Sequence, residues 1–180
     1  GTSTNGTTWT VQTSGTTTII YSLTYGNGKY IYGGAGGVLA TSTNGTTWTA
    51  QNTGLSPTIF SLTYGNGIYV LSNISSGIAT STDGITWTSR TSGTAAVINA
   101  ITYGNGIYVY GGNGGVLGTS TNSITWTTQT SGTTSVIYSL TYANGLFVYG
   151  GVGGVLGTST NSTTWTTQTS RSEEHTSELQ

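Results

Sequence analysis

The chain has 180 residues, of which only three are Lys or Arg, four are Asp or Glu, and none is Cys. So few basic residues argue against a nucleic-acid partner, because such binding relies on several Lys or Arg contacts to phosphate. The lack of cysteine excludes disulfides and thiolate metal sites, and no apolar run approaches the roughly 20 residues of a membrane helix. We therefore expect no nucleic-acid partner, no membrane insertion, no metal and no cofactor.

A strict internal repeat organises the chain. Its five tryptophans stand at positions 9, 48, 87, 126 and 165, so that each is 39 residues from the next. Such a register is the signature of one structural unit copied several times. The chain also carries twelve Tyr and two Phe, whereas disordered chains are poor in aromatic residues. We therefore expect a folded repeat protein.

The first half of the first complete unit predicts a β-hairpin. Residues 19–25 are rich in β-branched and aromatic side chains, as a strand should be. An Asn-Gly pair at 27–28 supplies the positive φ angles of a tight turn, and residues 30–32 form a second short strand. Strict alternation would put three large side chains of the first strand on one face: Tyr21, Leu23 and Tyr25.

The second half of the unit predicts another pair of strands. A glycine-rich connection at 33–37 leads to a third strand at 38–42, and a tight turn at 44–45 leads to a fourth strand at 47–51. In two later units, Ser123 and Ser162 replace the glycine of this last turn. A non-glycine residue with positive φ costs on the order of 1 kcal/mol, so we expect another turn type there.

Four short antiparallel strands per unit, with no helical period, predict an all-β fold. One such sheet cannot bury both of its faces, and radial repetition of packed sheets solves this problem. We predict an open fragment of a β-propeller with about four and a half blades. Residues 1–15 are the half-blade, and the full blades are 16–54, 55–93, 94–132 and 133–170. A Thr-rich β-solenoid is the competing architecture, although its coils are usually shorter and its strands parallel.

The last ten residues, 171–180, break the repeat abruptly. This stretch reads RSEEHTSELQ, contains five titratable residues and resembles the conceptual translation of a sequencing-adapter oligonucleotide. We interpret it as a non-native tail, to be excluded from the fold. The propeller fragment then comprises residues 1–170, and we expect a parent protein with more blades.

The turn between the third and fourth strands resembles a known motif. Residues 42–48, Ser-Thr-Asn-Gly-Thr-Thr-Trp, resemble the Asp-box or BNR repeat, and residues 81–87 are the nearest match. Asp and Gly are adjacent here, whereas the usual pattern has one residue between them. The repeat also looks like sialidase-like and photosystem II assembly-factor-like propellers, and like repeats of phage and bacterial surface proteins. We interpret the motif residues as structural: Ser3, Asn5, Trp9, Ser42, Asn44, Trp48, Ser81, Asp83, Trp87, Ser120, Asn122, Trp126, Ser159, Asn161 and Trp165.

A sialidase is the most specific enzyme hypothesis that the resemblance implies. Such enzymes bind a sugar carboxylate with three arginines and use a Tyr nucleophile assisted by Glu, with an Asp acid/base. Before the tail, this chain has one Arg, Arg90, and one Asp, Asp83, while most other glycosidases need two carboxylates. We therefore expect no catalytic residue, and the non-catalytic portion of a sialidase-like glycoside hydrolase stays an alternative.

We predict a non-enzymatic module for binding or surface display, located outside the cell or on a cell or virion surface. Antiparallel strand order gathers the glycine-rich loops and the inter-blade linkers on one uncharged rim, which suits neutral glycans. Another protein is the alternative partner, and a pure structural spacer stays open. Asn99 replaces an aromatic residue of the other units, and Arg90 replaces a glutamine. The binding candidates are Tyr32, Asn73, Arg90, Asn99, Tyr110 and Tyr149.

Overall fold

The computed structural model describes residues 1–55 and 57–169. These residues form four antiparallel sheets, each built from four strands that follow one another in the chain. We call the sheets blades 1 to 4 in chain order. The tail that the sequence predicts, residues 171–180, lies outside the described residues.

The four blades have matching elements. Blade 1 consists of β1 (Ile20–Gly26), β2 (Lys29–Gly34), β3 (Leu39–Ser42) and β4 (Thr49–Ala50). Blade 2 consists of β5 (Ile59–Gly65), β6 (Ile68–Asn73), β7 (Ile78–Ser81) and β8 (Thr88–Arg90). Blade 3 consists of β9 (Ile98–Gly104), β10 (Ile107–Gly112), β11 (Leu117–Ser120) and β12 (Thr127–Gln129). Blade 4 consists of β13 (Ile137–Ala143), β14 (Leu146–Gly151), β15 (Leu156–Ser159) and β16 (Thr166–Gln168). Short 3₁₀ turns join the second and third strands of three blades: η1 (Ala35–Gly37), η2 (Asn113–Gly115) and η3 (Val152–Gly154).

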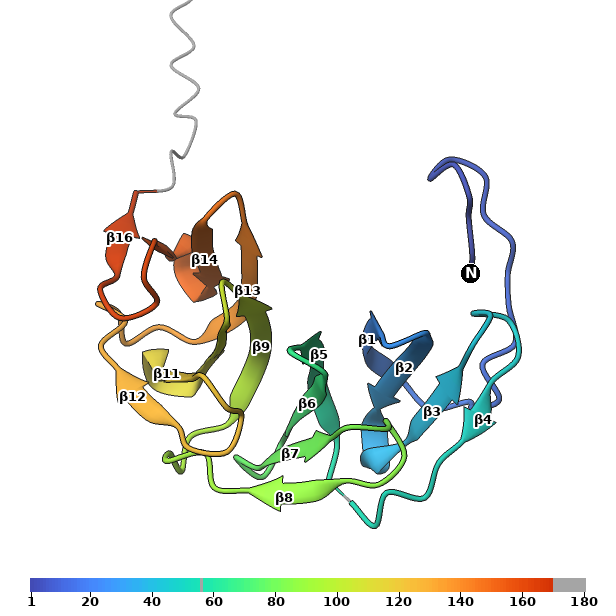
Figure 1. Cartoon of the computed structure of the whole chain (residues 1–180). Coiled ribbons are helices and arrows are strands. Elements are labelled where there is room, and N and C mark those ends of the chain that lie inside the picture. The colour runs from blue at the N-terminus through green and yellow to red at the C-terminus, as the bar shows by residue number, and fades with distance from the viewer. Residues whose placement is uncertain (56, 170–180) are drawn as a thin grey trace, which may run out of the picture.

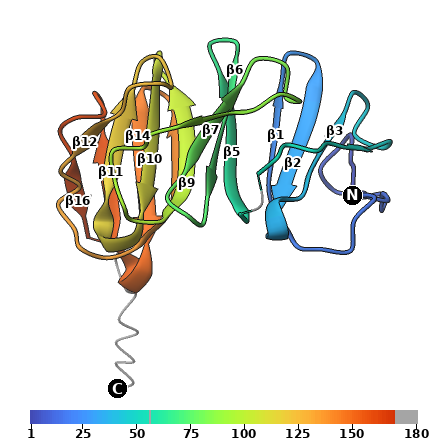
Figure 2. The ribbon, with the colours of Figure 1, turned by 90° about the horizontal axis from the view of Figure 1, so that it is seen from below.

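The blades stand side by side in an open arc, with the first strand of each on the inner side and the fourth on the outer side (Figure 1). Seen from below, they follow one another in chain order, and the N-terminal segment continues the arc beyond blade 1 (Figure 2). Residues 1–15, predicted as a half-blade, form one antiparallel bridge between Thr2 and Thr10. The all-β, blade-by-blade architecture predicted from the sequence is the one observed.

Apolar side chains from neighbouring blades form the core. Between blades 1 and 2, Ile31 and Leu39 meet Ile59 and Leu62 in one buried cluster. Equivalent clusters lie between blades 2 and 3 and between blades 3 and 4. Three of the repeated tryptophans pack against these clusters, as expected for apolar plates between sheets: Trp87, Trp126 and Trp165.

A glycine at the end of the first strand of blades 1, 2 and 3 allows the next blade to approach closely. A Cβ atom on Gly26 would lie 2.1 Å from Cγ of Tyr64 in the next blade, so the tyrosine ring packs directly on the glycine backbone. The hydroxyl of Tyr69 also donates a hydrogen bond to the carbonyl oxygen of Gly26. The same 2.1 Å separation recurs at Gly65 against Tyr103 and at Gly104 against Tyr142.

The turn between the first and second strands of a blade differs from the turn between the third and fourth strands. Between the first and second strands, Asn27 and Gly28 have φ angles of 45° and 74°, which fit the predicted tight Asn-Gly turn. Between the third and fourth strands, only the glycine is left-handed, as at Gly45 with φ 74°. Ser123 and Ser162 keep this conformation, with φ angles of 61° and 65°. The prediction of another turn type at these serines is therefore wrong.

The first strand of each blade departs from strict alternation. In blade 1, Ile20 pairs with Gly34 and Ser22 pairs with Gly33, so Tyr21 is the extra residue of a β-bulge. The same shift skips Phe60, Asn99 and Tyr138 in the other blades. The predicted single face for Tyr21, Leu23 and Tyr25 is therefore wrong at Tyr21, because the bulge turns that side chain away from the inter-blade core.

Candidate functional site

The residue that the bulge adds to the first strand is aromatic in three of the four blades. We call Tyr21, Phe60, Asn99 and Tyr138 the bulge row. Tyr21 is 48% exposed and Tyr138 is 62% exposed, while Phe60 and Asn99 are half-buried. Their strands β1, β5, β9 and β13 line the concave side in Figure 1. Bulges that re-aim a side chain are over-represented beside binding and active sites.

Contacts made by bulge-row residues link blade 1 to blade 2 and blade 3 to blade 4. The rings of Tyr21 and Phe60 meet edge to face, with centroids 5.6 Å apart. Asn99 donates two hydrogen bonds of 3.0 Å from Nδ2, one to the carbonyl oxygen of Ile137 in blade 4 and one to Oδ1 of Asn113. Asn113 begins η2, so Asn99 adjoins the connection between the second and third strands of blade 3.

The tyrosines proposed from the sequence as ligand platforms lie in the core instead. Tyr32 is 2% exposed, and the other two are fully buried, Tyr110 and Tyr149. The hydroxyl of Tyr110 donates to the carbonyl oxygen of Ser92 at 3.0 Å, and the ring packs on Trp126 with centroids 5.2 Å apart. Burial raises the pKa of Tyr110 to about 12. The interpretation of these tyrosines as ligand-binding residues is therefore wrong, because their rings and hydroxyls are already used inside the blades.

Two further candidates have local hydrogen-bonding partners. The buried side chain of Asn73 accepts hydrogen bonds at 3.0 Å from the backbone amides of Ser75 and Gly77, and so closes the loop after β6. Arg90 donates from Nε to Oγ1 of Thr80 at 3.0 Å. Glutamines make the equivalent bond in other blades, as Gln51 does to Thr41 at 2.9 Å. The structure thus assigns both residues roles within a blade, and of the candidates it brings only Asn99 into the bulge row.

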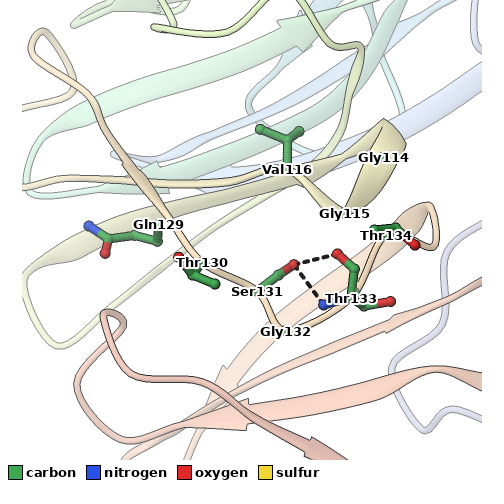
Figure 3. Close-up of a pocket in the computed structure, with 9 residues that line it drawn as sticks. All are labelled: Gly114, Gly115, Val116, Gln129, Thr130, Ser131, Gly132, Thr133 and Thr134. Carbon is green, nitrogen blue, oxygen red and sulfur yellow. Dashed lines mark hydrogen bonds between the residues drawn. The ribbon is translucent and has the colours of Figure 1, made fainter.

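An open pocket lies on the rim of blade 3 (Figure 3). Its volume is about 740 Å³, and its lining is uncharged. The lining residues are Gly114, Gly115, Val116, Gln129, Thr130, Ser131, Gly132, Thr133 and Thr134. Ser131 donates from Oγ to the carbonyl oxygen of Thr133 at 3.0 Å and accepts from the Thr133 amide at 3.2 Å, which fixes the linker into blade 4. The pocket offers hydroxyl and amide groups to a neutral ligand.

The turns that resemble the Asp-box are stabilised by hydrogen bonds from their own side chains. Ser81 donates from Oγ to Oδ1 of Asp83 at 2.8 Å, and the same carboxylate oxygen accepts from the amides of Ile85 and Thr86, each at 2.8 Å. These two amides, together with Ser81, lower the pKa of Asp83 to about 2. Asparagine makes the equivalent bonds in the other turns, as Asn44 does. The motif is therefore a turn device in every blade.

We expect Asp83→Asn to remove an acid sensitivity of the fold. Because the pKa of Asp83 lies below the value of about 3.9 for an unfolded Asp, its ionised form stabilises the fold above about pH 4, and this contribution is lost as the pH falls toward 2. Asparagine keeps the turn without titrating. Urea unfolding of both proteins between pH 6 and about pH 2 should show the unmodified chain losing more stability than the variant. A constant difference across this range would contradict the assignment.

Neither a metal cluster nor a membrane-spanning helix is found in the described part of the chain. Over residues 1–55 and 57–169, no three His, Cys, Asp or Glu side chains gather into a group that could hold a metal ion. Across the same residues, no helix has the length and apolar character needed to span a membrane.

Comparisons with known proteins support the fold. The structure described as YCF48 bound to D1 peptide matches with a TM-score of 0.72 at 18% identity, covering 87% of this chain and 55% of that one. YCF48 from Cyanidioschyzon merolae matches with a TM-score of 0.68 at 12% identity, covering 87% of this chain and 57% of that one. The computationally designed Ika4 protein matches with a TM-score of 0.66 at 16% identity, covering 80% of this chain and 92% of that one.

The chain spans little more than half the length of the two YCF48 chains. No protein-family model matches the sequence, and no curated protein matches it significantly. At these identities the likeness concerns the fold. The chain is a β-propeller-type repeat protein, built here from four blades in an open arc.

Proposed function

We propose that the chain is a non-enzymatic binding module that holds an extended, weakly charged polypeptide against its concave side. The observation that carries this proposal is the bulge row, in which Tyr21 and Tyr138 expose 48% and 62% of their surface. Exposed aromatic rings supply large contact areas at a low cost in conformational entropy. The row runs across all four blades, so a ligand that follows it contacts one side chain per blade.

Asn99 gives the row a polar position. Both hydrogen bonds of its side chain are donated by Nδ2. Among the described residues none donates to its Oδ1, so this oxygen can accept a backbone N–H from a ligand. One of the proteins of similar fold, YCF48, is bound to a peptide in its structure, which supports a peptide as the first ligand class to test.

The absence of enzyme activity is part of the proposal. Asp83 is the only carboxylate side chain of the described residues, and its Oδ1 accepts two backbone amides of its own turn. Arg90 is bonded to Thr80. This leaves no pair of carboxylates for glycosidic hydrolysis in the described region. An extracellular or surface location is proposed on the resemblance to repeats of phage and bacterial surface proteins.

Peptide selection would test the bulge row directly. Peptides selected from a displayed random library on the whole chain should bind the triple variant Tyr21→Ser, Phe60→Ser, Tyr138→Ser about tenfold more weakly or worse, because three apolar contacts are lost. The matched control is Ile85→Ser with Ile124→Ser, which removes two exposed apolar side chains from the turns between third and fourth strands. Equal affinity for the triple variant and the unmodified chain would overturn the proposal.

A neutral glycan is the second candidate ligand, and surface display of such a binding site is its corollary. The uncharged pocket of about 740 Å³ beside Ser131 and Thr133 favours it, since hydroxyl and amide groups suit sugar hydroxyls. A glycan array probed with the whole chain separates the two ligand classes. Signals that survive the triple variant but vanish with Thr134→Trp, which places a large side chain among the lining residues of the pocket, would favour the glycan.

A further inference from the structure

Three similar grooves lie between neighbouring blades in the described part of the chain. Each is formed by the second, third and fourth strands of one blade and is closed by the last turn of the next blade, at Ile85, Ile124 or Thr163. Their volumes are about 410, 340 and 290 Å³ in chain order. The groove between blades 2 and 3, which we call the Arg90 groove, is lined among others by Ile68, Thr80, Thr82, Thr88, Arg90 and Ile124.

Arg90 distinguishes this groove from the one between blades 1 and 2, where Gln51 stands at the equivalent position. Its Nε donates to Oγ1 of Thr80 at 3.0 Å, as Gln51 does to Thr41. Over residues 1–55 and 57–169, no hydrogen bond uses the two terminal nitrogens of Arg90, Nη1 and Nη2. The bond within the blade therefore orients the guanidinium and leaves two N–H donors for one carboxylate, which arginine binds in a bidentate manner.

Lys29 is the other basic side chain of the described residues, and it lines the groove between blades 1 and 2. Its ammonium donates to the carbonyl oxygen of Asp83 at 2.9 Å, in the turn of the next blade. An ammonium is a point charge without the planar fork that fits a carboxylate. The Arg90 groove is therefore the one that we expect to select a planar anion.

The other lining residues of the Arg90 groove favour a sugar. Thr82 and Thr88 are exposed, and no hydrogen bond of the described residues uses their hydroxyls. Each hydroxyl can both donate and accept, as the hydroxyls of a sugar do. Ile68 and Ile124 add apolar surface for the C–H groups of a ring. Asp83 directly follows Thr82 and is ionised at neutral pH, so a ligand with several negative charges meets repulsion.

We propose that the Arg90 groove binds a uronate residue of an acidic glycan. The sugar carboxylate accepts from Nη1 and Nη2 of Arg90, and the ring hydroxyls bond to Thr82 and Thr88. A volume of about 340 Å³ lies at the lower end of the range for small-molecule sites. The site is separate from the bulge row and from the pocket beside Ser131, so it does not depend on a ligand at either.

Trigalacturonate provides the probe, and its methyl ester is the matched ligand without charge. Calorimetric titration of the whole chain should show the acid binding about tenfold more tightly than the ester or better. Arg90→Gln should weaken binding of the acid about tenfold or more. This variant restores the residue found at 51, 129 and 168, which makes the same bond to a threonine, so its melting temperature should match that of the unmodified chain.

Further variants locate the binding site. Thr88→Val, which removes only a hydroxyl, should weaken trigalacturonate binding about threefold or more. The triple variant of the bulge row and Thr134→Trp should each leave it unchanged. Equal binding of acid and ester, equal binding by Arg90→Gln and the unmodified chain, or loss of binding in the triple variant would overturn the proposal. So would a pentaglutamate peptide that binds more tightly than trigalacturonate, because an acidic peptide would then be the ligand.

Discussion

Replacing Gly65 with alanine is expected to lower the free energy of unfolding by roughly 3 kcal/mol or more. A Cβ atom there would lie 2.1 Å from Cγ and 2.2 Å from Cδ1 of Tyr103, which are atoms at the base of the ring. The ring is itself packed on Tyr108, with centroids 4.6 Å apart, so it cannot swing away alone. Relief therefore requires blades 2 and 3 to separate. Urea unfolding followed by circular dichroism measures the loss.

The chain contains its own control for this substitution. Position 143 is equivalent to Gly65 but is occupied by alanine, and in the described structure Ala143 is exposed. Ala143→Gly should therefore change the free energy of unfolding by no more than about 1 kcal/mol, the usual cost of glycine in a regular element. If Gly65→Ala were equally mild, the contact between glycine and tyrosine would not set the spacing of the blades.

The repeat and most of its turns could be predicted from the sequence because both depend on local signals. The 39-residue spacing of tryptophan fixes the unit, and Asn27-Gly28 adopts the left-handed φ angles that this pair favours. The prediction for the serines at 123 and 162 is wrong, because the hydrogen bonds made by the preceding Ser and Asn side chains hold the turn in shape. The conformational preference of serine by itself does not take these hydrogen bonds into account.

The candidate site could not be predicted, because it depends on a shift in strand pairing. Tyr21 leaves the alternation of β1 because this strand contains one more residue than β2 between their paired positions. Strict alternation would place Tyr21 on the same face as Leu23 and Tyr25. The same shift explains why Ile59 and Leu62, three residues apart, both contact blade 1. One clue was present in the sequence: Asn99 interrupts an otherwise aromatic position, which is unusual for a buried side chain and fits an exposed one.

The serine turns have a partner in the preceding blade, and this pairing leads to the second large prediction. A Cβ atom on Gly84 would lie 2.4 Å from Cδ1 of Ile31, and Ile31 is fully buried. In the next repeat unit, 39 residues later, the position equivalent to Gly84 is Ser123. The position equivalent to Ile31 is Val70, which lacks the Cδ1 atom. A further step gives Ser162 and Val109. The smaller aliphatic side chain thus accompanies each serine.

Gly84→Ser alone should therefore destabilise the chain by about 2–3 kcal/mol, combining the cost of a left-handed serine with overpacking against Ile31. Ile31→Val alone should cost about 1 kcal/mol for the lost methyl group. In the double variant the serine occupies the space that Cδ1 leaves, so its total cost should fall below the sum of the single costs by about 1 kcal/mol or more. A double-mutant cycle by urea unfolding measures this coupling. Strict additivity would mean that the backbone angle, and not the contact between blades, decides which residue each turn accepts.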